Sequence, residues 1–342
     1  MTDKQWNDLL RVINGEILDP LPTGFIIDCP WLPNWAGMPI LDYFTSDSLW
    51  LKANMRAIRD FSDVMFLPGF WSEYGMCTEP SAFGARSNFP KDEFPHAFKV
   101  IQSSSDIEDL PVPNPAGDGL LPFMLNRLKL ARPQIEDAGH KIRFAVARGP
   151  LNIASYLMGS TEFLTTMMME PDKVALLIEK ISKFLKSWLE LQLETFPTID
   201  GILLLDDIIG FMGAEQFKQY GLPHFKDLYS LDVSVKFLHN DAPCEESAPF
   251  LPEIGVNLFN MGFDPSLNEL KKTTQNKVVM LGNIPPRDVL AAGTPEDVQK
   301  ATRELIDGLE DKSMVVVSCG GGMPPGVSTE NLQAFVDAVK QG

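Results

Sequence analysis

Three residues near the ends of predicted strands have the chemistry of a zinc site. His239 is one of four histidines and follows a short apolar run that is typical of a strand, with Asp241 two residues later. Cys319 follows another such run near the C-terminus. Imidazole and thiolate are preferred zinc ligands, and a carboxylate completes a three-ligand set with one position open to substrate. The alternative is a hydrogen-bonded histidine and a buried cysteine without a metal.

Carboxylate and amide side chains follow other predicted strands. Asp206 and Asp207 come directly after the run ILLL, and adjacent residues at a strand end point to opposite sides. We therefore expect one aspartate to face a cavity as a catalytic group, while the other caps the next helix or pairs with a cation. Asn283 follows a further strand and is the third candidate catalytic residue. The alternative is a purely structural role for both aspartates, in caps and salt bridges.

Aromatic and charged side chains after the first three predicted strands are candidates for substrate binding. Trp31 and Trp35 follow the first strand and could stack on an aromatic ring. Glu73 follows the second strand, and Arg148 ends the third. The alternative for the two tryptophans is a place in the core of a lid.

A repeated unit of strand, polar loop and helix must position these residues. Most of the predicted strands are continuous apolar runs, as expected for strands buried on both faces of a parallel sheet. Eight such units predict an α/β fold of the TIM (β/α)8 barrel type, whose active site lies just after the strands. A doubly wound open sheet is the alternative, although no G-x-G-x-x-G motif follows the first strand. The predicted strands span residues 24–27, 64–67, 142–147, 201–205, 235–238, 256–259, 278–281 and 314–317.

The helices between the strands carry their own signals. Residues 161–196 have apolar side chains at roughly the helical period, and Pro171 predicts two helices there rather than one. Thr294, Pro295 and Asp297 predict a capped helix start. We expect residues 1–342 to form a single barrel domain. The stretch 69–141 exceeds the minimal unit, so we expect it to be an insertion after the second strand that caps the barrel mouth, with a surface excursion of no function as the alternative.

The composition is that of a globular protein with an acidic surface. Among 342 residues, 29 are basic and 46 acidic, which gives a formal charge of -17. Such a field repels phosphate backbones and argues against general nucleic-acid binding. There is no run of 18 apolar residues and no signal-peptide pattern, so we expect a cytoplasmic protein without a membrane span. Cys29, Cys77, Cys244 and Cys319 include no C-x-x-C pair and make no disulfide framework.

Five segments between residues 149 and 341 resemble the uroporphyrinogen decarboxylase superfamily, and they occur in the superfamily's order. They are GPLNIASYLMGS, the aspartates of GILLLDDIIGF, KFLHNDAP, LGNIPPRDVL and GGGMPPGVSTENLQAFVDAV. The resemblance implies a TIM barrel, in agreement with the strand count. It also implies one of two chemistries, because the superfamily contains decarboxylases and corrinoid-dependent methyltransferases.

The decarboxylase branch has an N-terminal Arg-Gln-Ala-Gly-Arg segment that holds the carboxylates of its substrate. This chain reads CPWLPNW in the corresponding place. The methyltransferase branch generally binds zinc through His-x-Cys after the fifth strand and a Cys after the eighth. His239 matches the histidine, Asp241 stands in place of the first cysteine, and the second falls at Gly321, two residues after Cys319. A set of His239, Asp241 and Cys319 is one reading, and a site completed by a carboxylate elsewhere in the barrel is another.

The resemblance therefore implies a corrinoid-dependent methyltransferase that uses a small O-methyl donor, such as a methyl ether or alcohol. A hard carboxylate in place of a thiolate makes zinc more electrophilic, which favours an oxygen substrate. We expect the corrinoid to arrive free or on a corrinoid protein as partner, with a homodimer as a further option. The alternatives are a divergent decarboxylase of a small acid and a non-catalytic barrel that binds a corrinoid or another tetrapyrrole.

Overall fold

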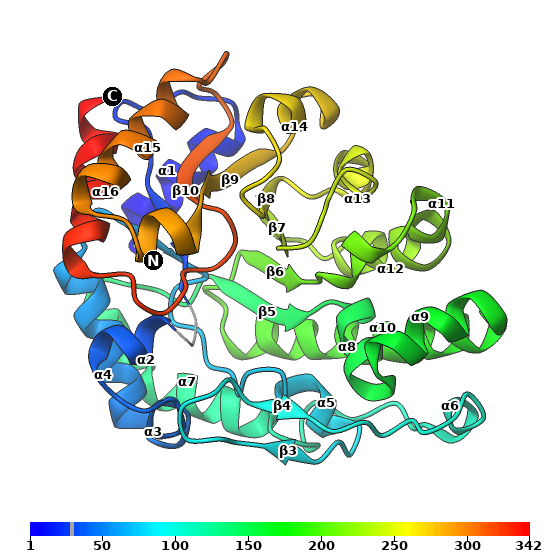
Figure 1. Cartoon of the computed structure of the whole chain (residues 1–342). Coiled ribbons are helices and arrows are strands. Elements are labelled where there is room, and N and C mark those ends of the chain that lie inside the picture. The colour runs from blue at the N-terminus through cyan, green and yellow to red at the C-terminus, as the bar shows by residue number, and fades with distance from the viewer. Residues whose placement is uncertain (28–30) are drawn as a thin grey trace.

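The predicted strands form where the apolar runs place them, and the predicted TIM barrel is confirmed (Figure 1). The computed structural model describes residues 1–27 and 31–342. Cys29, one of the four cysteines, lies outside the described residues. The ends of the observed strands differ from the predicted ends by up to three residues. The barrel strands are β1 (Gly24–Ile26), β2 (Met65–Leu67), β5 (Phe144–Arg148), β6 (Gly201–Leu205), β7 (Val235–Asn240), β8 (Leu258–Met261), β9 (Val279–Ile284) and β10 (Val315–Cys319).

All eight strands are parallel, and they pair in the order β2-β1-β10-β9-β8-β7-β6-β5. Strands β5 to β10 form one sheet and β1 pairs with β2. Single bridges between Thr23 and Val317 and between Ile26 and Gly322 join β1 to β10. Within the described ranges, no backbone pairing links β2 to β5, so a seam remains between them.

Side chains replace the missing neighbour on the β5 side of this seam. The Gln192 side chain accepts from the backbone N–H of Val146 and donates to its carbonyl, both at 3.0 Å. The Glu79 carboxylate accepts from the backbone N–H of Arg148 at 3.1 Å. These contacts satisfy backbone groups that would otherwise be buried without partners.

The helices form an outer layer around the barrel, and one helix crosses its amino-terminal end (Figure 1). In α1 (Asp3–Ile13), Trp6, Leu9 and Val12 pack against the first residues of the strands, including Phe144. The capping box of Thr2 and Gln5 starts this helix. Pro171 separates two helices, and Thr294 and Asp297 form a capping box, both as predicted.

The remaining elements complete this outer layer and the loops after the strands. The first half of the chain holds α2 (Trp31–Ala36), α3 (Ile40–Thr45), α4 (Asp47–Asp60), α5 (Thr78–Ala82), β3 (Ser87–Asn88), β4 (His96–Ala97), α6 (Asp106–Asp109), α7 (Leu121–Asp137), α8 (Pro150–Met158), α9 (Ser160–Met169) and α10 (Pro171–Thr195). The second half holds η1 (Ile208–Phe211), α11 (Ala214–Gln216), η2 (Phe217–Gly221), α12 (Leu222–Leu228), η3 (Ala248–Phe250), α13 (Leu251–Ile254), α14 (Leu267–Thr273), η4 (Pro286–Ala291), α15 (Pro295–Asp307) and α16 (Thr329–Gln341). In the described ranges, every helix is too short or too polar to traverse a lipid bilayer.

The stretch 69–141 contains α5, the β3–β4 hairpin, α6 and α7. The hairpin pairs Ser87 with Ala97 and Asn88 with His96. Helix α7 leads into β5 and occupies the place of the barrel's own second outer helix. That this stretch caps the mouth stays a prediction.

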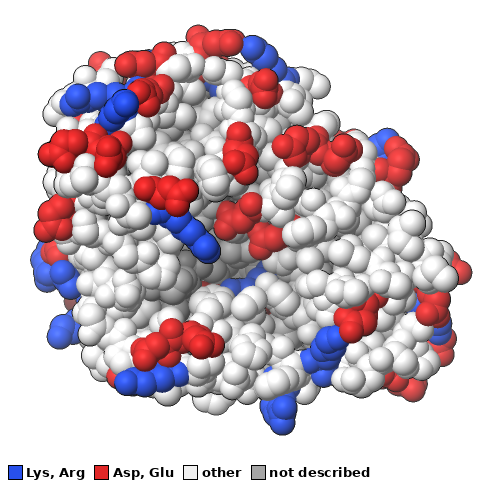
Figure 2. Space-filling view, viewed as in Figure 1, with Lys and Arg blue, Asp and Glu red and all other residues white. Residues whose placement is uncertain are grey.

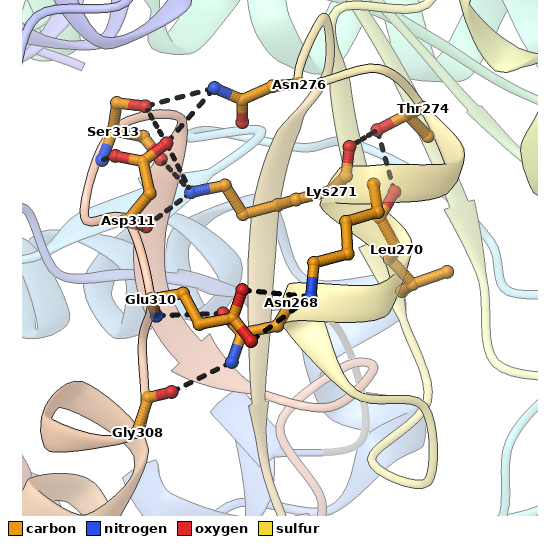
Figure 3. Close-up of polar contacts among 10 residues, drawn as sticks. Asn268, Leu270, Lys271, Thr274, Asn276, Gly308, Glu310, Asp311 and Ser313 are labelled. Carbon is orange, nitrogen blue, oxygen red and sulfur yellow. Dashed lines mark hydrogen bonds and ion pairs between the residues drawn. The ribbon is translucent and has the colours of Figure 1, made fainter.

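A buried lysine ties α14 to the loop that leads into β10 (Figure 3). The Lys271 ammonium donates to the backbone carbonyls of Asp311 and Ser313 and lies 3.2 Å from the Asp311 carboxylate. Asn268 adds bonds to Gly308 and Glu310 from the same helix. The cluster fixes the point at which β10 enters the barrel.

Lys271→Met should lower the free energy of unfolding by about 2 kcal/mol, because charge-assisted bonds are lost while the alkyl stem stays packed. Denaturant unfolding followed by circular dichroism measures the change. Lys272→Met is the matched control, since Lys272 pairs with Glu310 on the exposed side of the same helix and should change stability by less than about 1 kcal/mol. Equal changes in the two variants would contradict the role of Lys271.

Candidate active site

A layer of buried polar side chains closes the barrel interior at the carboxyl ends of the strands. Side chains two residues apart on a strand point the same way, so each polar residue continues a column of interior apolar residues such as Val146, Phe237 or Leu281. The layer contains Arg148, His239, Asn260, Asn283 and Ser318, all buried. The sequence analysis chose Arg148, His239 and Asn283. It did not choose Asn260 and Ser318, which also stand at the ends of predicted strands and which this alternation marks.

The His239 ring is oriented by a hydrogen-bonded amide. Its Nδ1 lies 2.7 Å from Asn260 Oδ1, and Asn260 Nδ2 donates to the Leu281 carbonyl at 2.7 Å. Because the second bond fixes the direction of the amide, Nδ1 of the neutral ring carries the proton. His239 Nε2 lies 3.7 Å from Asp241 Oδ2.

Backbone contacts hold Asp241 over the mouth. Asp207 Oδ1 accepts from the backbone N–H of Asp241 at 2.8 Å, so Asp207 positions the turn after β7. Gly321 passes directly beside the Asp241 carboxylate. A Cβ at Gly321 would lie 2.1 Å from Asp241 Oδ1, and the φ of Gly321 is 67°, so glycine is required on both counts.

The structure does not assemble the predicted zinc ligands into one site. Cys319 shares the orientation of Val315 and Val317 on β10, so its thiol packs against the outer helices and is fully buried. Burial raises the pKa of this thiol, which disfavours the thiolate that zinc requires. In the part of the chain that the structure describes, no group of three His, Cys, Asp or Glu side chains is arranged to hold a metal ion. Only His239 and Asp241 lie close together.

Asp206 and Asp207 point in opposite directions, as predicted, but Asp206 caps α8, the helix directly after β5, rather than the helix that follows β6. Asp206 Oδ2 accepts from the backbone N–H groups of Leu151 and Asn152 at 2.9 and 3.2 Å, at the start of α8. A Cβ at Gly149 would lie 2.2 Å from that oxygen, so this position needs glycine. The side chain of Asp206 is buried and does not reach the mouth. Burial raises the pKa of Asp206 to about 8.

The predicted substrate-binding residues Glu73 and Arg148 form a buried ion pair. Arg148 Nη2 lies 2.8 Å from Glu73 Oε2, and Arg148 Nη1 lies 3.8 Å from Glu79 Oε2. The Trp71 ring lies under the guanidinium, with its centroid 5.9 Å from Cζ. Glu79 was missed by the sequence analysis, because the fold of the loop after β2 brings it to β5 and no local pattern marks it.

The two tryptophans after β1 join α2 to the start of α16. Trp31 and Trp35 stack at 5.2 Å between ring centroids, and their indole N–H groups donate to Val327 and Thr329. Trp31 is 0% exposed, so its ring is part of the core and offers no face to a substrate. Trp35 is partly buried, with the Arg56 guanidinium 3.9 Å from its ring centroid. This arrangement supports the alternative in which Trp31 belongs to the core of a lid and does not bind substrate.

A cavity of about 430 Å³ opens beside the polar layer, at the ends of β7 to β10. Asn283 Nδ2 donates to Pro265 O at 2.8 Å and thereby holds the loop that forms one wall. Figure 2 shows a hollow near the centre of this face, with acidic and basic side chains around it. The cavity is lined by Asp241, Gly262, Phe263, Pro285, Pro286, Arg287, Asp288, Gly320, Gly322, Met323, Pro324 and Pro325.

Comparisons with known proteins agree with this architecture. Uroporphyrinogen decarboxylases from Chloroherpeton thalassium and Pseudoalteromonas atlantica are 24% and 26% identical to this chain over 295 and 276 residues. These matches cover 82% and 77% of this chain and 78% and 75% of the relatives.

Two solved structures share the fold. A methyltransferase from Methanosarcina mazei superimposes with a TM-score of 0.82 at 19% identity, covering 98% of this chain and 97% of its own. A B12-independent methionine synthase from Shewanella sp. W3-18-1, in complex with selenomethionine, gives 0.57 at 13% identity, covering 94% and 98%. The family model described as uroporphyrinogen decarboxylase (URO-D) matches residues 7–342. The chain therefore belongs to the uroporphyrinogen decarboxylase (URO-D) family.

Proposed function

We propose that this protein is a cytoplasmic methyltransferase that moves a methyl group between a small O-methyl donor and a corrinoid cofactor. The observation that carries this proposal is the pairing of Arg148. This buried cation at the mouth is already shared by Glu73 and Glu79. A porphyrinogen with eight carboxylates would meet a strongly acidic chain there, and its charges would go uncompensated.

The size of the mouth cavity supports a small donor. The cavity beside the polar layer has a volume of about 430 Å³, within the range of small-molecule sites. A methyl ether or alcohol fits easily. The corrinoid is a co-substrate that arrives free or on a partner protein and meets the mouth from outside.

The Methanosarcina mazei protein that shares this fold is a methyltransferase, so the fold is compatible with methyl transfer. In such a reaction the reduced corrinoid supplies the nucleophile that accepts the methyl group. This chain would align the donor and activate its leaving oxygen. Three side chains provide a rigid frame for that task, because each forms a hydrogen bond with a neighbouring backbone or side-chain amide group. They are His239, Asp207 and Asn283. No step is assigned to zinc, since its predicted ligands are not assembled.

The test is incubation of the purified protein with chemically reduced cobalamin and a panel of methyl ethers, methanol and methylamines. Methylcobalamin should form from an O-methyl donor, as followed by its visible absorbance, and the protein-free mixture is the control. Should none of the panel give methylcobalamin while a carboxylic acid releases carbon dioxide, the decarboxylase alternative replaces this proposal.

A further inference from the structure

Arg148, Glu73 and Glu79 form a buried cluster with more negative than positive charge. Arg148 comes from the end of β5, Glu73 from the loop after β2, and Glu79 from α5, so the cluster fills the seam of the barrel. The three residues are 5%, 4% and 1% exposed, and none of the charges is solvated by bulk water. One guanidinium compensates one carboxylate, which leaves a formal charge of −1 in a buried site.

Two carboxylate oxygens of this cluster are buried without a hydrogen-bond partner. They are Glu73 Oε1 and Glu79 Oε2, one on each acid, and the neighbouring Ser72 Oγ is in the same condition. An ionised carboxylate buried with an unsatisfied oxygen is costly, and binding a proton removes that cost. Burial accordingly raises the pKa of both glutamic acids, although the Arg148 charge opposes this.

The groups that face the cluster from other elements do not supply the missing positive charge. They are the Tyr156 phenol on α8 and the Cys77 thiol before α5, and burial raises the pKa of each, so both are neutral near pH 7. Asp206 and Asp207, at the end of β6, act electrostatically on Tyr156, and neither supplies a positive charge. A proton is therefore the available counter-charge.

We propose that the Glu73–Arg148–Glu79 cluster holds one exchangeable proton at neutral pH, and that Glu73 donates it to the oxygen released during methyl transfer. The step rests on the proposed function. Glu73 is the donor because its carboxylate bonds to the guanidinium of Arg148, which belongs to the polar layer at the mouth, whereas Glu79 is fixed to the β5 backbone. Glu79 is a positioning residue, because its charge keeps the proton in the cluster.

The step balances in atoms and charge. The oxygen–methyl bond breaks and its electron pair stays on oxygen, while the reduced corrinoid provides the pair for the new bond to the methyl carbon. The carboxyl proton moves to the oxygen, so an alcohol or phenol leaves instead of an alkoxide. Glu73 is left as carboxylate and takes a new proton from solvent. General acid catalysis of this kind contributes on the order of 10²–10⁴-fold to a rate.

Infrared spectroscopy of the protein without substrate tests the proton directly. The wild type at pH 7 should show the carbonyl-stretch absorbance of protonated carboxyls from the cluster and from Asp206. Asp206→Asn removes the Asp206 share and serves as the reference background. In that background, Glu73→Gln and Glu79→Gln should each abolish the remaining band, because either change leaves one carboxylate per guanidinium. A band that persists in both variants overturns the proposal.

The rate of methyl transfer provides a second test of the proposal. With a methyl ether donor, Glu73→Gln should lower kcat by on the order of 10²–10⁴-fold. In the wild type the rate should fall as pH rises through the raised pKa of the cluster. In Glu79→Gln this fall should move to lower pH, a shift that a purely structural role would not cause. Glu304→Gln, on exposed α15, is the control and should leave rate and profile unchanged.

The two proposals fail in distinguishable ways. If methyl transfer occurs but the infrared band is absent, the proton cluster is refuted. If methyl transfer occurs and kcat is unaltered in Glu73→Gln, Glu73 is refuted as the proton donor. Neither outcome contradicts the proposed function. The band without methyl transfer from any donor refutes the function and leaves the cluster as a property of the fold. Gln has nearly the shape of Glu, and circular dichroism identifies any variant that has lost the fold.

Discussion

Arg148→Met should lower the free energy of unfolding by about 3–5 kcal/mol at pH 7, because it removes the cation between two buried carboxylates. Methionine keeps much of the volume of the side chain, so the change isolates the charge. Glu73 and Glu79 must then bind protons on folding that they release on unfolding. Denaturant titrations followed by circular dichroism measure the effect.

The pH dependence of this loss gives a second check. Below about pH 4 both carboxyls are protonated in the folded and unfolded states, so the difference between variant and wild type should shrink. Arg132→Met is the control, since Arg132 pairs with Glu136 on the exposed face of α7 and should cost less than about 1 kcal/mol. A constant difference from pH 4 to pH 8 would contradict the burial of uncompensated charge.

Asp206→Asn should remove a large pH dependence of stability. The pKa of Asp206 is about 8 in the folded protein and 3.8 in the reference state. Between these values the unfolded chain has lost the proton and the folded chain retains it, so the wild type loses stability as pH rises. The loss is on the order of 5 kcal/mol across the window, at about 1.4 kcal/mol per pH unit. Asparagine has no such proton, and its oxygen can still accept from the N–H groups of α8.

The measurement is the free energy of unfolding of both proteins from pH 4 to pH 8, and the stability of the variant relative to wild type should rise with pH. Asp311→Asn is the control, because hydrogen bonds from Ser313 lower the pKa of Asp311 to about 2, so the stability difference between this variant and the wild type should stay constant from pH 4 to pH 8. Its wild-type contribution appears as pH rises from about 2 to 4, and it is small because Asp311 is half exposed. Parallel curves for wild type and Asp206→Asn would show that Asp206 is ionised when folded.

The barrel itself could be predicted from the sequence because its strands are local features. Each is an apolar run such as that of β6, bounded by polar loop residues, and strands buried on both faces need no tertiary information to be recognised. The helix break at Pro171 and the cap at Thr294 were equally predictable, since both depend on residues a few positions apart. The same reasoning placed Arg148, His239 and Asn283 at one end of the barrel.

The tertiary structure decided which of these strand-end residues face the mouth. A shift of one residue turns a side chain to the other face of a strand, and predicted strand ends are uncertain by more than that. Cys319, the last residue of β10, and Asp206, directly after β6, therefore turned outward. Trp31 entered the core, where its indole N–H bonds to Val327 just before α16, and Glu79 reached Arg148 because the loop after β2 folds back onto β5. The sequence determined the barrel and the end at which its polar residues gather, because both follow from local patterns. Side-chain direction and partners across the seam depend on register and on contacts between distant segments, which only the folded chain defines.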